Sequence, residues 1–63
     1  MTLTKVYIVM VKIQAGFDDY MWQEYTGNFH LDSESAYREF CNAQLEMMED
    51  PTILDVNIDE VYR

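Results

Sequence analysis

One long helical segment with clear start and stop signals constrains the fold of this chain most. Residues 32–50 read DSESAYREFCNAQLEMMED, and Pro51 follows directly. Asp32 or Ser33 can accept the first free backbone N–H groups, and an acidic side chain near the start suits the helix dipole. Pro51 lacks a backbone N–H and disfavours the α conformation at Asp50. The segment therefore predicts a single helix that ends just before Pro51.

The apolar face of this helix is broad. At about 100° per residue, the apolar face carries Ala36, Tyr37, Phe40, Cys41, Ala43, Gln44, Met47 and Met48, and the polar face carries Arg38, Glu39, Asn42, Glu46 and Glu49. One small sheet does not need so wide a face, which favours self-association. Gln44 lies near the middle of the face, where an unpaired buried amide costs roughly 1–3 kcal/mol. Its amide is expected either to bond its counterpart in a second subunit or to be satisfied within the core.

The segment before the helix has the pattern of a β-hairpin. Residues 2–14 are rich in β-branched and aromatic side chains and are apolar on both faces. Such a strand is expected at the centre of a sheet or beneath a partner subunit. Turn-forming residues at 15–19 predict a return strand over 20–25, or as far as Phe29, with an interruption near Gly27.

The segment after the helix predicts a third strand. Residues 52–62 alternate, with Leu54, Val56 and Ile58 expected inward and acidic side chains outward. The predicted fold class is α+β: a β-β-α-β chain with one helix packed on a three-stranded antiparallel sheet, as a homodimer. Residues 1–63 are expected to form a single domain. A chain of this length buries only about 60% of its unfolded surface, so we expect marginal stability, for which self-association is a usual remedy.

Composition excludes several kinds of site. Cys41 is the only cysteine and His30 the only histidine, so neither a disulfide nor a zinc site is expected within one chain, and Cys41 should pack as a small thiol. His30 has no convincing nucleophile to activate. The run from Asp55 to Asp59 resembles a calcium loop only superficially, since the later glutamate ligand is missing. We therefore expect no metal, no cofactor and no enzymatic activity.

The charge balance indicates what the chain avoids. Twelve acidic residues stand against four basic ones, which gives a net charge of −8. Such a chain should avoid nucleic acid and anionic membranes, and its field either steers it to a basic partner or serves solubility alone. No apolar run approaches the roughly 18 residues of a membrane span, and no leader peptide is evident at the amino terminus. A cytoplasmic location is expected, in the host cell if the chain is viral.

The arrangement of these features resembles a known family. The shared features are a first strand ending near Gln14, an acidic turn at Asp18 and Asp19, the run Trp22-Gln23-Glu24-Tyr25 followed by Gly27, a helix begun by Asp and Ser, and a final strand over 53–61. Together they resemble the small, acidic, homodimeric uracil-DNA glycosylase inhibitors of Bacillus podoviruses. The likeness lies in arrangement more than in residue identities.

The resemblance implies a dimer that imitates DNA and occupies the DNA-binding groove of the host's uracil-DNA glycosylase. In that family, helix residues of both subunits form an apolar pocket for the side chain that the enzyme wedges into the duplex. Glu24 and Tyr25 match the family's Glu-Tyr pair, with Glu24 in place of a phosphate. On the helix, Tyr37, Glu39 and Phe40 match by residue type. The expected partner-binding residues are Glu24, Tyr25, Tyr37, Glu39, Phe40 and Gln44, and the expected dimer or core residues are Cys41, Met47 and Met48.

Two other interpretations remain open from the sequence. The first is an anti-host or anti-defence inhibitor of a different nucleic-acid-binding protein, and the second is a small acidic regulatory or structural domain without DNA mimicry. Salt dependence of binding separates the second of these from any charge-driven inhibitor.

Overall fold

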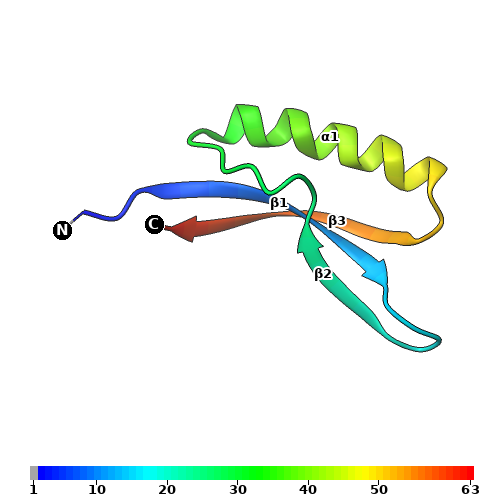
Figure 1. Cartoon of the computed structure of the whole chain (residues 1–63). Helices are drawn as coiled ribbons and strands as arrows, with labels where there is room; N and C mark the ends of the chain where they lie inside the picture. The colour runs from blue at the N-terminus through cyan, green and yellow to red at the C-terminus, as the bar shows by residue number, and fades with distance from the viewer. Residues whose placement is uncertain (1) are drawn as a thin grey trace.

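The computed structural model describes residues 2–63 and contains the expected elements in the expected order. They are β1 (Lys5–Gln14), β2 (Tyr20–Glu24), α1 (Ser33–Glu49) and β3 (Ile53–Tyr62). The strands form one antiparallel sheet in the order β2-β1-β3, and the helix lies along one face of it (Figure 1). The α+β prediction of three antiparallel strands and one helix is confirmed.

The first strand lies at the centre of the sheet, as one of the two expectations for it required. β1 pairs with β2 on one side and with β3 on the other. It begins at Lys5, later than predicted, and just before it two backbone bonds between Thr4 and Arg63, with N···O distances of 2.7 and 2.9 Å, close the ladder with β3. Thr2 and Leu3 lie beyond this paired region.

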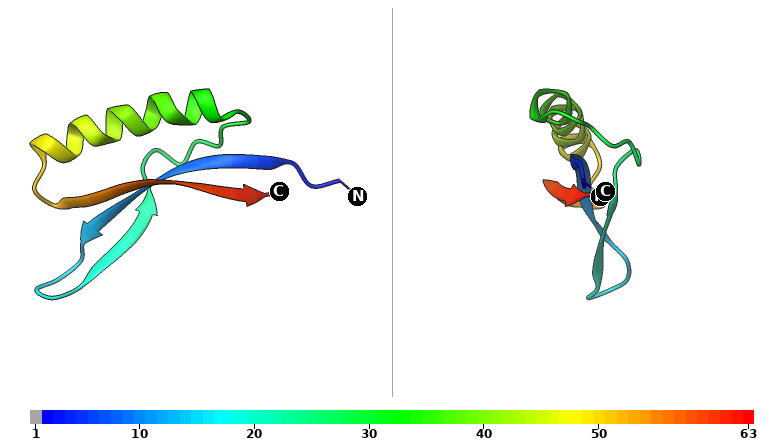
Figure 2. Two further views of the ribbon diagram at one scale, coloured as in Figure 1. Left: turned by 180° about the vertical axis from the view of Figure 1, so that it is seen from behind. Right: turned by 90° about the vertical axis from the view of Figure 1, so that its left-hand side faces the viewer.

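The β1–β2 hairpin forms as predicted, but its second strand is short. A backbone bond of 3.0 Å from the Ala15 N–H to the Asp19 carbonyl closes the turn. β2 ends at Glu24 and continues neither to Tyr25 nor to Phe29, because Gly27 turns the chain with a φ of +79°. Figure 2 shows the following loop rising beside the sheet to the start of the helix.

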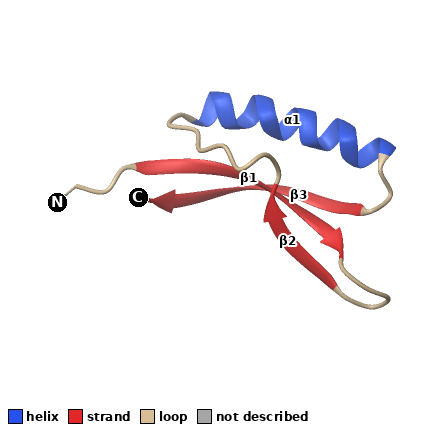
Figure 3. Ribbon diagram, viewed as in Figure 1, coloured by secondary structure: helices blue, strands red, loops and turns tan. Residues whose placement is uncertain are grey.

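The helix covers β1 and β3 and leaves β2 uncovered. Figure 3 shows this single helix above the crossing strands. Its inward row is Ala36, Phe40, Ala43 and Met47. Ala36 and Ala43 are fully buried, and Phe40 and Met47 pack against a core made of Val9, Val11, Ala43 and Val56. Alanine has no side-chain atoms beyond Cβ, so these two positions let the helix approach the strands closely. The helix does not reach β2, and every residue of β2 is exposed.

One strand position departs from the predicted alternation. Lys12 pairs with Asp55 and Ile13 pairs with Ile53, so Leu54 is an extra residue in β3 that opposes nothing in β1. Leu54 is consequently 45% exposed, so its predicted inward position is wrong, and Ile53 packs against the core in its place. A β-bulge moves each residue beyond it to the other face, and simple alternation cannot reveal it. Val56 and Ile58 face the core as predicted.

The start of the helix is fixed by Asp32. Its Oδ1 accepts the Ser35 backbone N–H at 2.7 Å, and this bond holds the pKa of the Asp32 carboxyl below its usual value. Asp50 ends the helix, and its backbone N–H donates to the Glu46 carbonyl at 2.7 Å. The predicted limits on both sides are therefore confirmed. Within residues 2–63, no helix combines the length and the apolar character needed to cross a membrane.

Candidate functional site

The outward side of α1 carries an unpaired apolar row. We call Tyr37, Cys41, Gln44, Leu45 and Met48 the outer helix row. Tyr37 is 59% exposed, Leu45 62% and Met48 82%, while Cys41 is half-buried. Gln44 is exposed too, so its amide is not satisfied within the core of the single chain, and its pairing with a counterpart in a second subunit stays a prediction. The predicted apolar face, which does not include Leu45, divides between this row and the inward row, one residue apart along the helix.

Glu39 faces inward, although the helical period assigns it to the polar side. Its Oε1 accepts the Thr26 hydroxyl at 2.6 Å, and its Oε2 pairs with His30 Nε2. The side chains of Glu39 and His30 are only 11% and 17% exposed. The pair ties the loop after β2 to the helix, close to the backbone bonds of 2.8 and 2.9 Å that join His30 to Tyr7 of β1.

Replacing Glu39 with alanine should destabilise the chain. The change leaves the half-buried His30 ring and the Thr26 hydroxyl without their acceptor, and a lost partner of this kind costs about 1–3 kcal/mol. Urea unfolding followed by circular dichroism measures the effect. Glu34→Ala is the matched control, because Glu34 bonds Arg38 on the surface with both side chains over three-quarters exposed, where such pairs contribute only about 0–1 kcal/mol. Equal losses in the two variants would contradict a structural role for Glu39.

The basic side chains are all engaged within the chain. Lys5 pairs with Glu60 at 3.2 Å and Arg38 with Glu34 at 3.2 Å. The Lys12 ammonium lies 3.8 Å from the centre of the Tyr20 ring, and the Arg63 guanidinium lies 4.3 Å from that of Phe29. Among the described residues, none of these four side chains forms an ion pair with any carboxylate other than Glu60 and Glu34.

Most carboxylates are exposed and lack an ionic partner. Of the twelve, Glu34, Glu39 and Glu60 form ion pairs with described side chains. The other nine are Asp18, Asp19, Glu24, Asp32, Glu46, Glu49, Asp50, Asp55 and Asp59, all exposed. They occupy the hairpin turn, both ends of the helix and the sheet face turned away from it.

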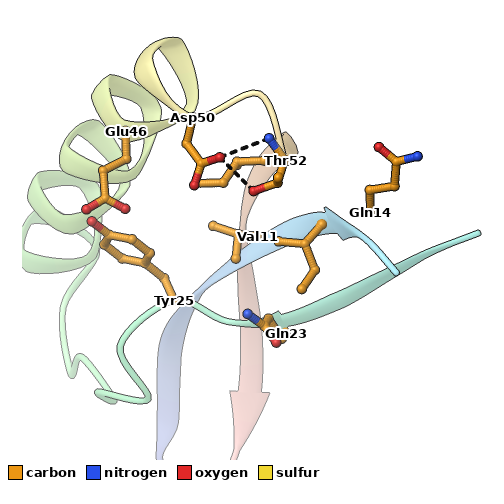
Figure 4. A pocket seen from close by; sticks show the side chains of 9 residues that line it. Val11, Gln14, Gln23, Tyr25, Glu46, Asp50 and Thr52 are labelled. Carbon is orange, nitrogen blue, oxygen red and sulfur yellow. Dashed lines mark hydrogen bonds between the residues drawn. The ribbon is translucent and has the colours of Figure 1, made fainter. Parts of the chain in front are cut away.

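An open groove of about 460 Å³ separates the end of α1 from the β1–β2 hairpin (Figure 4). Its lining residues are Val11, Ile13, Gln14, Gln23, Tyr25, Glu46, Asp50, Thr52 and Ile53. Tyr25 has a raised pKa, first because of burial and then because the Glu46 carboxylate lies at its hydroxyl. Of these residues only Tyr25 was singled out from the sequence. The signal that was available is the spacing of Glu46 and Asp50, one helical turn apart.

The predicted site residues do not form one cluster. Glu24 pairs in register with Met10. Because Met10 lies between the helix-facing Val9 and Val11, Glu24 belongs to the face of the sheet turned away from the helix, which we call the open face. Tyr25 lies in the groove on the helix side. The Tyr37 and Phe40 rings stack with centroids 6.1 Å apart.

The three residues predicted to lie in the dimer interface or the core also differ in burial. Met47 packs inward, Cys41 is half-buried and Met48 is exposed. Among residues 2–63, no group of three or more His, Cys, Asp or Glu side chains is arranged to hold a metal ion.

No protein-family model, curated protein or solved structure shows significant similarity to this chain.

Proposed function

We propose that this chain is a DNA-mimicking inhibitor that binds uracil-DNA glycosylase as a homodimer and performs no chemistry of its own. A glycosylase that flips bases out of the duplex offers a basic groove and often an apolar wedge. An inhibitor of such an enzyme needs exposed carboxylates in place of phosphates and an apolar surface near them. The chain carries both on its outside.

The observation that carries the proposal is that most of the exposed carboxylates form no ion pair with a described side chain. Nine exposed carboxylates have no ion-pair partner among the described side chains, and the four basic side chains are engaged locally. If acidity served the stability of the monomer, more of it would be compensated internally. Uncompensated carboxylates instead create a negative field that attracts a DNA-binding groove.

Glu24 is the carboxylate that we assign to the enzyme, and Glu39 is not. Glu24 is exposed at the end of β2. Its Oε2 lies beside Gly27, 3.5 Å from the point where a Cβ atom on that glycine would stand. Both oxygens of Glu39 are already engaged by Thr26 and His30. The residue-type match on the helix therefore does not extend to a phosphate-like role for Glu39.

The outer helix row supports the dimer. Four of its members are spaced four, three and four residues apart, which is typical of helices packed side by side; they are Tyr37, Cys41, Gln44 and Met48. Exposed apolar side chains along such a seam are normally covered by another chain. Two copies of the row facing each other would cover these exposed side chains.

Replacing Met48 with glutamate should dissociate the dimer. Met48 is 82% exposed in the single chain, so a charge there costs the monomer little, whereas a charge buried in an interface without a partner is strongly unfavourable. Sedimentation velocity at micromolar concentration should show a dimer for the unmodified chain and a monomer for Met48→Glu. Asn42→Glu, which adds the same charge outside the row, should remain dimeric. A monomeric unmodified chain would contradict the dimer.

Complex formation tests the function. The chain and purified uracil-DNA glycosylase should elute together from a gel-filtration column at low salt and separate as the salt concentration rises, because charge-driven contacts are screened. Separate elution at low salt would contradict the proposal.

A second target class is favoured by one observation. With Glu39 turned inward, the remaining acidic surface contains no feature that selects a uracil-specific enzyme over another protein with a basic groove. An inhibitor of a different nucleic-acid-binding protein of the host is the alternative. Affinity capture from host lysate, followed by mass spectrometry, names the partner directly and separates the two.

A further inference from the structure

The groove beside Tyr25 has an apolar floor and an acidic rim. Val11 is buried, and Ile13 and Ile53 are half-buried, so the floor is hydrocarbon. The rim carries the carboxylates of Glu46 and Asp50 and the amides of glutamines 14 and 23, as Figure 4 shows from close by. Within residues 2–63, no lysine, arginine or histidine lines it.

The electrostatics of the rim favour a cation. Glu46 and Asp50 lie one turn apart at the carboxyl end of α1, and the last turn of the helix contains no basic residue. The partial negative charge of the helix end therefore adds to two carboxylates without a compensating cation. One oxygen of Asp50, Oδ1, accepts the Thr52 N–H at 3.0 Å and the Thr52 hydroxyl at 2.6 Å. No described side chain donates a hydrogen bond to the other oxygen of Asp50, Oδ2. No described side chain forms an ion pair with Glu46.

The acceptors around the groove are partly pre-oriented. The Gln14 amide nitrogen donates to the Gly16 carbonyl at 3.0 Å, which fixes the side chain at the start of the turn. The Tyr25 ring stands between the core and Glu46, with its hydroxyl toward that carboxylate (Figure 4). A planar ring of this kind gives a cationic side chain a stacking surface as well as a charge partner.

We propose that this groove seats an arginine side chain of the protein that the chain binds. The methylene groups of the arginine would lie on Ile13 and Ile53, and its guanidinium would reach Glu46 and the other polar groups of the rim. Arginine fits better than lysine because its planar fork donates to two acceptors at once and stacks on an aromatic ring, whereas an ammonium is a strongly hydrated point charge. The inference rests on the proposed function only in taking the partner to be a protein that presents basic side chains.

A titration with small probes tests the groove apart from any enzyme. N-acetyl-arginine amide is added to the ¹⁵N-labelled chain, and backbone amide shifts are followed by NMR, with N-acetyl-citrulline amide as the neutral probe of the same shape and N-acetyl-lysine amide as the point charge. We expect saturable shifts confined to Gln23, Tyr25, Thr52 and their neighbours for the arginine probe, weaker shifts for lysine and none for citrulline. Glu46→Gln should weaken arginine binding about tenfold, the size expected for one charge-assisted hydrogen bond.

Glu49→Gln is the matched control, since it removes the same charge from the same helix end but does not line the groove. It should leave arginine binding unchanged. The inference is overturned if the arginine shifts do not saturate, if they spread equally over Asp18, Asp19 and Asp55, if citrulline or lysine binds as well, or if the two variants behave alike. Arginine binding without any complex with the glycosylase would leave the groove intact and reject that enzyme as partner. Complex formation without arginine binding would reject only the groove.

Discussion

Replacing Ala43 with leucine is expected to lower the free energy of unfolding by about 1–3 kcal/mol, the usual cost of adding bulk to a packed core. Ala43 is fully buried among Val9, Val11 and Val56, so a larger side chain must push the helix away from the sheet. A domain of this size has little stability to lose. The midpoint of urea unfolding should therefore fall markedly, and the chain should be partly unfolded at physiological temperature.

Gln44→Leu is the matched control one position along the helix. Gln44 is exposed, so leucine there should change stability by less than about 0.5 kcal/mol, as surface substitutions usually do. It should also strengthen the dimer, because it makes the outer helix row more apolar. If Gln44→Leu destabilised the chain and Ala43→Leu did not, the helix would be rotated relative to the orientation described above.

The second large effect is expected from reversing charges on the open face of the sheet. Glu24→Lys combined with Asp59→Lys should weaken binding to the glycosylase about a hundredfold, because carboxylates that faced a basic groove become like charges, which cost several kcal/mol. Asp59 pairs with Ile8 and Glu24 with Met10, so both belong to the face away from the helix. Surface plasmon resonance at two salt concentrations measures the loss and the reduced salt dependence.

The control for this reversal keeps the net charge equal. Glu34→Lys with Glu49→Lys makes the same change in total charge on the exposed helix surface. It should weaken binding far less, through the long-range field alone. Equal weakening in both double variants would mean that the acidity acts only through net charge and that the open face of the sheet does not contact the enzyme.

Sequence reasoning predicted the fold where local chemistry decides the outcome. Asp32 accepts the first free N–H and Pro51 follows the last turn, and these two residues alone fix the helix to within a residue. The apolar character of both faces of residues 5–14 required a central or covered strand. The bulge at Leu54 escaped prediction because it depends on how β3 pairs with β1, which the alternation within one strand does not contain.

The site was less accessible to prediction, because it depends on the rotation of the helix. The periodic pattern gives a face wider than the sheet needs and does not say which part of that face packs inward. Two buried alanines and the contact of Glu39 with His30 decide that question in the structure. The groove was missed because its lining comes from β1, β2, the end of α1 and the start of β3, which come together only after folding.

The most direct test of the account is an excision assay with purified uracil-DNA glycosylase and uracil-containing duplex DNA. The proposed mimicry predicts that excision falls linearly as the chain is added and stops at one dimer per enzyme, without any change in the DNA itself. Excision that continues unchanged at a several-fold molar excess of the chain would contradict the central claim.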